Sequence, residues 1–163
     1  MNIKEIKIKI TEFTGISELP EEEQNLLQQA AKSTSSSYAP YSEFHVGAAV
    51  LLENGDIICG SNQENAAYPS GLCAERVALF YANSKYPGVK VKTLAISAHA
   101  DHFVIGKPIS PCGTCRQVIA ETENRQKSKI RILMQGETGT VNMTEGIANL
   151  LPLTFYEEKL KKK

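Results

Sequence analysis

The sequence predicts an α/β protein of three layers, in which helices cover both faces of a mixed sheet of about five strands. Segments with the apolar periodicity of strands alternate with segments that have the periodicity of helices, which is typical of this class. The chain has 163 residues, 42% of them hydrophobic and 22% charged, as in ordinary globular proteins. Since no repeat or low-complexity linker divides it, we expect one domain over residues 1–163.

The first third of the chain is expected to form an edge strand, a helix and a hairpin. Residues 3–13 alternate apolar and charged side chains, with Ile6, Ile8 and Ile10 on one face, which predicts a half-buried edge strand protected by lysines. This strand would lie in an N-terminal extension, residues 1–20. Pro20 and three following glutamates predict the start of a helix that ends in the serines of residues 33–37. Strands are then expected at 45–52 and 56–61, joined by an Asn-Gly turn.

The rest of the chain continues the alternation of helices and strands. Helices are expected at about 73–84 and 112–124, and strands at about 91–98 and 130–134. A polar loop occupies 99–111, and a further strand near 140–142 precedes a short helix. The lysine-rich end, residues 157–163, is expected to be a flexible tail.

The charge balance limits the partners that the protein can have. Formal net charge is zero, with 18 basic and 18 acidic side chains, whereas a protein that binds a phosphate backbone needs a positive field. We therefore expect a small-molecule partner and no nucleic acid. Charges interleave the apolar residues of the first ten positions, so these form no secretory signal, and we expect a cytoplasmic protein with reduced thiols and no membrane partner.

Three cysteines have the spacing of a metal site. Cys112 and Cys115 lie three residues apart at the expected start of a helix, so their sulfurs project from one side of its first turn. Cys73 opens another helix, and helix N-termini favour thiolates over thiols. Structural zinc commonly has four protein ligands, whereas catalytic zinc has three and an open position. We therefore predict one Zn²⁺ per subunit at these cysteines.

Two charged residues follow Cys73 directly. Glu75 is too close to Cys73 in sequence to be a comfortable ligand, but it is close enough in space to reach a water molecule on the metal, which suits a proton shuttle. Arg76 shares a side of the helix with Cys73. It is expected to donate hydrogen bonds to the ligand sulfurs and to offset the negative charge of three thiolates.

These residues belong to a longer pattern that runs in register from about residue 26 to residue 160. The motifs are Tyr38-Ala39-Pro40-Tyr41-Ser42-x-Phe44-x-Val46-Gly47-Ala48-Ala49, Asn62-x-Glu64-Asn65-Ala66, Cys73-Ala74-Glu75-Arg76 and Ser110-Pro111-Cys112-Gly113-x-Cys115-Arg116-Gln117. The cysteine and glutamate motifs are those of the zinc deaminases in their three-cysteine form. Taken together, the four motifs resemble cytidine deaminase of the short, homotetrameric type.

The resemblance implies a cytidine-deaminase-like fold and the hydrolytic deamination of free cytidine and 2′-deoxycytidine, with release of ammonia, as in pyrimidine salvage. Glu75 would move protons from water to ring nitrogen N3 and to the leaving group. The residues matching Asn62 and Glu64 hydrogen-bond the ribose hydroxyls in this family. The backbone N–H matching Ala74 binds the base carbonyl, and Phe44 would pack against the pyrimidine.

The resemblance also implies a homotetramer whose active sites are completed by neighbouring subunits. Tyr68 and Phe155 match the residues that reach a neighbour's site in this family. Tyr156 follows Phe155 where a glycine is usual, so the sequence leaves open which of these two aromatic side chains covers the base.

Several alternatives stay open on the residues alone. Cys112-x-x-Cys115 by itself could be a redox pair or half of a structural zinc knuckle. Cys59 could be a fourth ligand, but a buried, inert thiol is favoured. His99 and His102 have the spacing of a pair of metal ligands. The favoured interpretation is that they lie in a solvated loop and bind no metal.

Other functions also stay open. Within the superfamily, the rivals are deamination of another aminopyrimidine nucleoside and deamination of cytosine in a polynucleotide. A zinc-stabilised binding domain without catalytic activity is the alternative from a different class.

Overall fold

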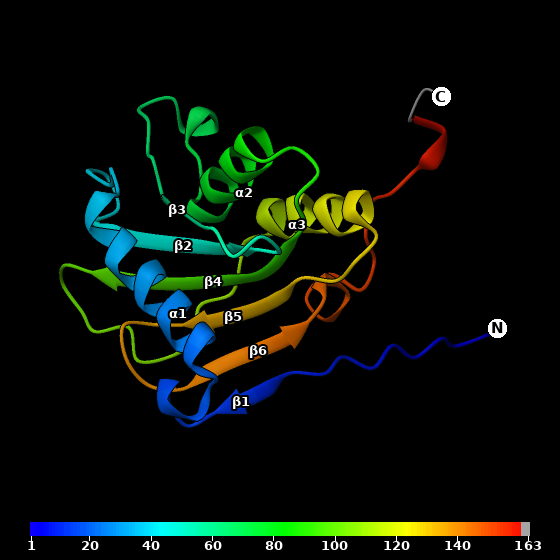
Figure 1. Cartoon of the computed structure of the whole chain (residues 1–163), viewed down its shortest axis with the longest axis horizontal. Coiled ribbons are helices and arrows are strands. Elements are labelled where there is room, and N and C mark those ends of the chain that lie inside the picture. The colour runs from blue at the N-terminus through cyan, green and yellow to red at the C-terminus, as the bar shows by residue number, and fades with distance from the viewer. Residues whose placement is uncertain (161–163) are drawn as a thin grey trace.

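The computed structural model describes residues 1–160, and within them six strands form one sheet with helices on both faces (Figure 1). The strand order is β1-β6-β5-β4-β2-β3. The strands are β1 (Thr11–Phe13), β2 (Phe44–Leu52), β3 (Ile57–Ser61), β4 (Val91–Ala100), β5 (Arg131–Gln135) and β6 (Val141–Glu145). The α-helices are α1 (Glu21–Ser33), α2 (Ala74–Lys85) and α3 (Gly113–Gln126). None of the helices in this described part is long and apolar enough to cross a membrane.

The sheet is mixed, as the sequence predicts. Strands β4 and β5 are parallel, with α3 in the connection between them, and the other neighbouring pairs are antiparallel. We expected about five strands and an additional strand at the N-terminal edge. Residues 1–160 contain six strands in one sheet, so the expected fold class is confirmed.

Helix α1 covers one face of the sheet, together with Ile16 and Leu19 of the segment that precedes it (Figure 1). Its buried Leu26, Leu27 and Ala30 pack on side chains of β2, β4, β5 and β6. The contact with β2 is close because position 47 is glycine. A Cβ atom there would lie 1.9 Å from the carbonyl oxygen of Ala30, so any side chain at Gly47 would displace α1.

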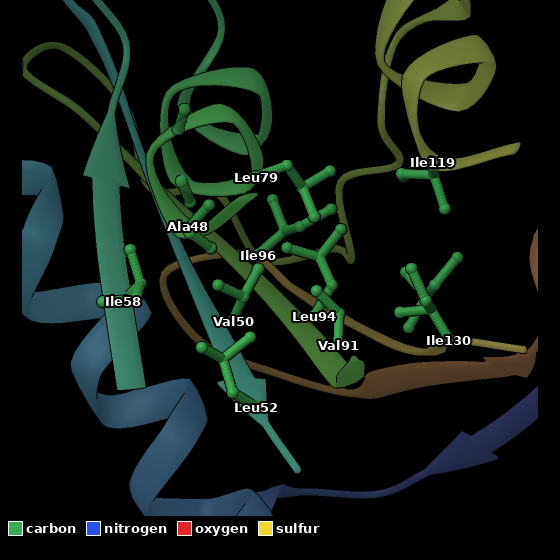
Figure 2. Packing of buried hydrophobic residues seen from close by; sticks show 14 of the residues in the cluster. Ala48, Val50, Leu52, Ile58, Leu79, Val91, Leu94, Ile96, Ile119 and Ile130 are labelled. Carbon is green, nitrogen blue, oxygen red and sulfur yellow. The ribbon is translucent and has the colours of Figure 1, made fainter. Parts of the chain in front are cut away.

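Helices α2 and α3 cover the opposite face, where the largest core cluster lies (Figure 2). In this cluster Ala48 and Val50 of β2 and Ile96 of β4 pack under Leu79 of α2. Gly60 of β3 brings α2 close to the sheet edge, because a Cβ atom at this position would lie 2.6 Å from the Ala78 nitrogen and 2.8 Å from the Ala74 oxygen. The first turn of α2, which begins after Cys73, is thereby fixed against β3.

The N-terminal strand is much shorter than expected. Only Thr11–Phe13 pairs with β6, and Ile6, Ile8 and Ile10 are 45–54% exposed. In this register residue 9 would lie opposite Glu145, where β6 ends, so the preceding residues have no strand beside them. The alternating pattern is compatible with a half-buried strand, but the expectation over residues 3–10 is wrong because the sheet offers no partner there.

Other boundaries differ by a few residues. Strand β4 continues to Ala100, so His99 lies in the strand and not in the loop that follows. Strand β6 is longer than expected, and the short helix after it is a single 3-10 turn, Ile147–Asn149. Of the tail expected over residues 157–163, Glu158–Leu160 form another such turn, and residues 161–163 lie outside the described residues.

Candidate active site

The three predicted ligands meet where α2 and α3 begin. Cys73 and Cys112 are the residues immediately before α2 and α3, and Cys115 lies in the first turn of α3. The Cys112 sulfur is 3.7 Å from that of Cys73 and 3.5 Å from that of Cys115, and all three sulfurs lie within 4.8 Å of one another. A tetrahedral zinc ion with Zn–S bonds of 2.3 Å would hold its sulfurs about 3.8 Å apart. The donor set and its spacing therefore fit zinc.

Helix geometry explains why thiolates are stable at this point. The backbone of Cys73 and of Cys112 is extended, and each carbonyl accepts the first hydrogen bond of its helix, from Arg76 and Arg116 respectively. Neither side chain caps its helix, so the N–H groups of both first turns remain available to anions. Two helix dipoles thus act on one cluster of sulfurs.

Arg76 adds a full positive charge to the cluster. One guanidinium nitrogen, Nη2, donates to the carbonyl oxygen of Gly71 at 3.1 Å and to the Cys73 sulfur at 3.8 Å. Hydrogen bonds from Cys115 and Arg76 lower the pKa of Cys73 to about 5 in the protein without metal. The proton shared with Cys73, together with burial, raises the pKa of Cys115. Cys73 therefore ionises first, and a bound metal ion would ionise the remaining thiols.

Glu75 is buried beside these sulfurs, with 4% of its surface exposed. Burial raises the pKa of its carboxyl group, although hydrogen bonds with its own backbone N–H and with Cys115 oppose the shift. A carboxyl group whose pKa is moved toward neutrality can both accept and return a proton.

An open cleft of about 930 Å³ leads to this group of residues, which is a suitable volume for a small molecule. It is lined by Tyr41, Ser42, Phe44, Val46, Asn62, Gln63, Glu64, Asn65, Tyr68, Gly71, Leu72, Cys73, Glu75, Arg76, Ile109, Ser110 and Cys112. The cleft thus brings the predicted metal ligands Cys73 and Cys112 together with most of the residues that the sequence assigned to substrate binding.

Asn62 and Glu64 are held rigidly in this cleft. The Asn62 amide accepts from the Val46 N–H at 2.8 Å and donates to the Phe44 carbonyl at 2.9 Å, which leaves its second N–H free for another acceptor. Glu64 accepts from the backbone N–H of Tyr41 at 2.9 Å and from the Ser42 hydroxyl at 2.5 Å. Burial works against ionisation, but these hydrogen bonds prevail and lower the pKa of Glu64, which is therefore negatively charged at neutral pH.

Two of the remaining predicted residues border the same site. The side chain of Ala74 is fully buried, and its backbone begins α2, where N–H groups have no partner within the helix. Tyr68 lies in a 3-10 turn with 75% of its surface exposed, and its ring packs edge-on against Tyr41 at a centroid distance of 6.0 Å.

Phe155 does not line the cleft of its own chain. It is 73% exposed and borders a different cavity, of about 420 Å³, together with Tyr156. Its backbone is held by the side-chain amide of Gln117, which donates to the Phe155 carbonyl at 2.8 Å and accepts from the Phe155 N–H at 3.3 Å.

Sequence reasoning missed these supporting contacts. Arg116 donates to the Pro111 carbonyl at 2.8 Å and to the Leu150 carbonyl at 2.7 Å, so it joins the loop before α3 to the C-terminal segment. Arg116 and Gln117 stand in the cysteine motif, which could have marked them, but their partners Leu150 and Phe155 lie 34 and 38 residues away in sequence. Ile109 and Ser110 of the cleft wall carried no sequence signal beyond their proximity to Pro111.

Cys59 does not belong to the group of sulfurs that could hold a metal ion, so it is not a fourth ligand. It is also not buried. It lies in the edge strand β3 and is exposed. Side chains alternate along a strand, so Ile58 and Gly60 face α2 while Cys59 points to the other side. The Cys59 side chain is exposed there, because β3 is the last strand at this edge of the sheet, so the expected burial is wrong.

Comparison with known proteins agrees with this geometry. The family model of the cytidine and deoxycytidylate deaminase zinc-binding region matches residues 20–129. The chain belongs to this family. The matched region is the zinc-binding one, and these three cysteines are a group within it that could hold one metal ion, with the sulfur spacing that zinc requires.

Relatives of the deaminase family match along most of the chain. Cytidine deaminase of Sporosarcina psychrophila is 41% identical over 84% of this chain and 93% of its own length, and that of Halalkalibacterium halodurans is 38% identical over 84% and 96%. The crystal structure of cytidine deaminase from Burkholderia pseudomallei aligns with a TM-score of 0.69 and 36% identity, over 80% of this chain and 97% of that one. The fold is thus that of the cytidine deaminases.

Proposed function

We propose that the protein is a zinc-dependent hydrolase that deaminates free cytidine and 2′-deoxycytidine to uridine and 2′-deoxyuridine. The observation that carries this proposal is the buried Glu75 carboxyl beside three zinc-binding sulfurs, in a cleft that also holds Asn62 and Glu64. The relatives named cytidine deaminase, which match most of the chain, support the choice of nucleoside.

Glu75 performs the proton transfers of this mechanism. When bound, zinc lowers the pKa of a water molecule and so supplies the hydroxide that adds to C4 of the base. Glu75 takes the proton of that water and gives it to N3. The same carboxylate then takes the proton of the new C4 hydroxyl and gives it to the amino group. The C4–N bond breaks, ammonia leaves, and the C4 carbonyl of the product forms. Its raised pKa makes the carboxylate a stronger base toward the proton of the water than an exposed glutamate would be.

The walls of the cleft orient the nucleoside. The N–H of Ala74 donates to the base carbonyl, and Phe44 packs against the ring. The charged Glu64 accepts a hydrogen bond from a ribose hydroxyl, while the free N–H of Asn62 donates to another. A carboxylate at the ribose disfavours a phosphodiester, and the zero net charge of the chain disfavours a polynucleotide.

Assembly into a homotetramer is part of the proposal. Tyr68 and Phe155 would complete the sites of neighbouring subunits. This is supported by their exposure and by the position of Phe155 outside its own cleft. Phe80 and Tyr81 of α2 are also half exposed, and exposed aromatic groups are common at subunit interfaces. We also infer a cytoplasmic location, in which the thiols stay reduced.

The test is ammonia release from cytidine, 2′-deoxycytidine and a cytosine-containing oligonucleotide, with the Glu75→Gln variant as a matched control. Both nucleosides should react, and the oligonucleotide and the variant should not. Turnover of the oligonucleotide alone would overturn the nucleoside assignment. Zinc content without turnover of any substrate would favour a binding domain.

A further inference from the structure

A second group of metal-binding side chains lies where β2 begins and β4 ends. His45 of β2 is directly opposite His99 of β4, and the two imidazole rings stack with a centroid distance of 6.0 Å and an interplanar angle of 27°. Asp101 follows β4, and its Oδ1 atom lies 3.2 Å from His45 Nε2 and 3.7 Å from His99 Nε2. One carboxylate oxygen thus faces the same nitrogen atom of both rings.

The opposite nitrogen of each ring already has a partner. The Ser37 hydroxyl lies 2.6 Å from His45 Nδ1, and a Glu137 carboxylate oxygen lies 3.3 Å from His99 Nδ1. Without metal, His45 Nε2 lies at hydrogen-bond distance from the Asp101 carboxylate and donates to it. When an ion takes the place of this proton, Nδ1 becomes the donor to Ser37 in His45 and to Glu137 in His99, and each Nε2 presents its lone pair to the ion. Histidine ligands of metals are characteristically oriented in this way, by a carboxylate or other acceptor on the second nitrogen.

The carboxylates of this group have no lysine or arginine partner among the ion pairs recorded for the described residues. Within residues 1–160, every ion pair recorded for Asp101 and Glu137 is with a histidine. A divalent cation between the rings and Asp101 would place a permanent positive charge beside them.

We propose that His45, His99 and Asp101 form a second divalent metal site, which takes zinc or a similar borderline ion and is independent of the cysteines. Two imidazoles and a carboxylate suit such ions, and ligand atoms 2.0–2.1 Å from a tetrahedral ion lie about 3.3 Å apart, close to the distances at Asp101. In the described chain only the cysteines bring three ligand atoms within 4.8 Å of one another. Binding therefore requires the His99 ring, which is 47% exposed, to turn toward Asp101.

The ion would join three segments that are distant in sequence. His45 follows Phe44 of the cleft wall, His99 is the last residue but one of β4, and Glu137, which would hold the His99 ring, lies in the connection after β5. Because an ion that binds only the folded chain stabilises it, micromolar zinc should raise the melting temperature of protein whose cysteine site is already filled.

The experiment counts zinc and does not depend on deaminase activity. Protein loaded with one zinc per chain is titrated with Zn²⁺ by calorimetry, and its zinc content is measured after gel filtration in buffer containing free Zn²⁺. Wild type should hold two ions per chain. The variants His99→Ala and Asp101→Asn should hold one. Glu137→Gln should weaken the second ion by about 10- to 100-fold, as loss of an orienting partner does.

His102→Ala is the matched control, since His102 lies in the same neighbourhood but pairs with Glu43. It should keep both ions with unchanged affinity. One zinc per chain in wild type would overturn the proposal and leave the group as an ion-pair cluster. A second zinc retained by both His99→Ala and Asp101→Asn would also overturn it. Circular dichroism checks that the variants fold. If a ligand variant does not fold, the affinity of the second ion in Glu137→Gln provides the test.

Discussion

Gln117 offers a quantitative test of how the C-terminal aromatic residue is positioned. The Gln117→Ala substitution removes both hydrogen bonds that hold the Phe155 backbone, of 2.8 and 3.3 Å. Each is worth about 0.5–1.5 kcal/mol, and both are exposed, so we expect a loss of about 1–2 kcal/mol in positioning Phe155. If Phe155 contacts the nucleoside in a neighbouring subunit, KM for cytidine should rise about 5- to 30-fold while kcat changes little.

A double-mutant cycle with Phe155→Ala separates this positioning role from a general effect on folding. Once Phe155 is truncated, removal of Gln117 should have almost no further effect on KM, because the two residues act through one contact. Steady-state kinetics of wild type, both single variants and the double variant measure the coupling. Additive effects of the two substitutions would refute the reasoning, as would a Gln117→Ala variant with unchanged KM.

The remaining predictions concern the metal site, the core and pH. Glu75→Gln should keep its zinc and lose at least 10²-fold in kcat, by metal analysis and ammonia release; retained turnover would remove Glu75 from proton transfer. Arg76→Ala should weaken zinc retention against a chelator by about 10- to 100-fold, and unchanged retention would rule out charge compensation. Gly60→Ala should lower stability to denaturant by about 1–3 kcal/mol, since its Cβ would meet the α2 backbone, whereas Gly15→Ala, in open space, should not. Burial raises the pKa of Glu123 above 4.5 despite hydrogen bonds from two backbone N–H groups, so stability falls as pH rises from 4.5 through the raised pKa. Glu123→Gln, which keeps an acceptor without the charge, should therefore raise the melting temperature more at neutral pH than at pH 4.5; an equal shift at both would contradict this assignment.

Local patterns predicted the metal ligands better than the edges of the fold. Cys112 and Cys115 share one helical turn, so their common direction follows from helix geometry alone. The approach of Cys73 depends on more, because Gly60 must let α2 lie close to β3. The sequence could connect these three cysteines only through a motif, whereas the structure shows the contact that brings them together.

The errors have one physical origin. The alternation around Ile6, Ile8 and Ile10 indicates that a strand could be half buried there, but burial needs a neighbouring strand, and β6 ends too early. Cys59 stands in a sequence segment that resembles a core strand, but its side chain is exposed because β3 is the edge strand of the sheet. Periodicity predicts the capacity of a segment to pack, and only the arrangement of the other elements decides whether it packs.

The sequence by itself determined the alternation of helices and strands through short-range periodicity, and it placed Cys112 and Cys115 on one helical turn and Glu75 next to Cys73. It joined Cys73 to the other two cysteines only through the deaminase motif. The tertiary structure alone decided the hydrogen bonds of Gln117 with Phe155, which lies 38 residues further along. It also decided that His45 and His99 would face one carboxylate, because strand register brings together residues that no local pattern relates.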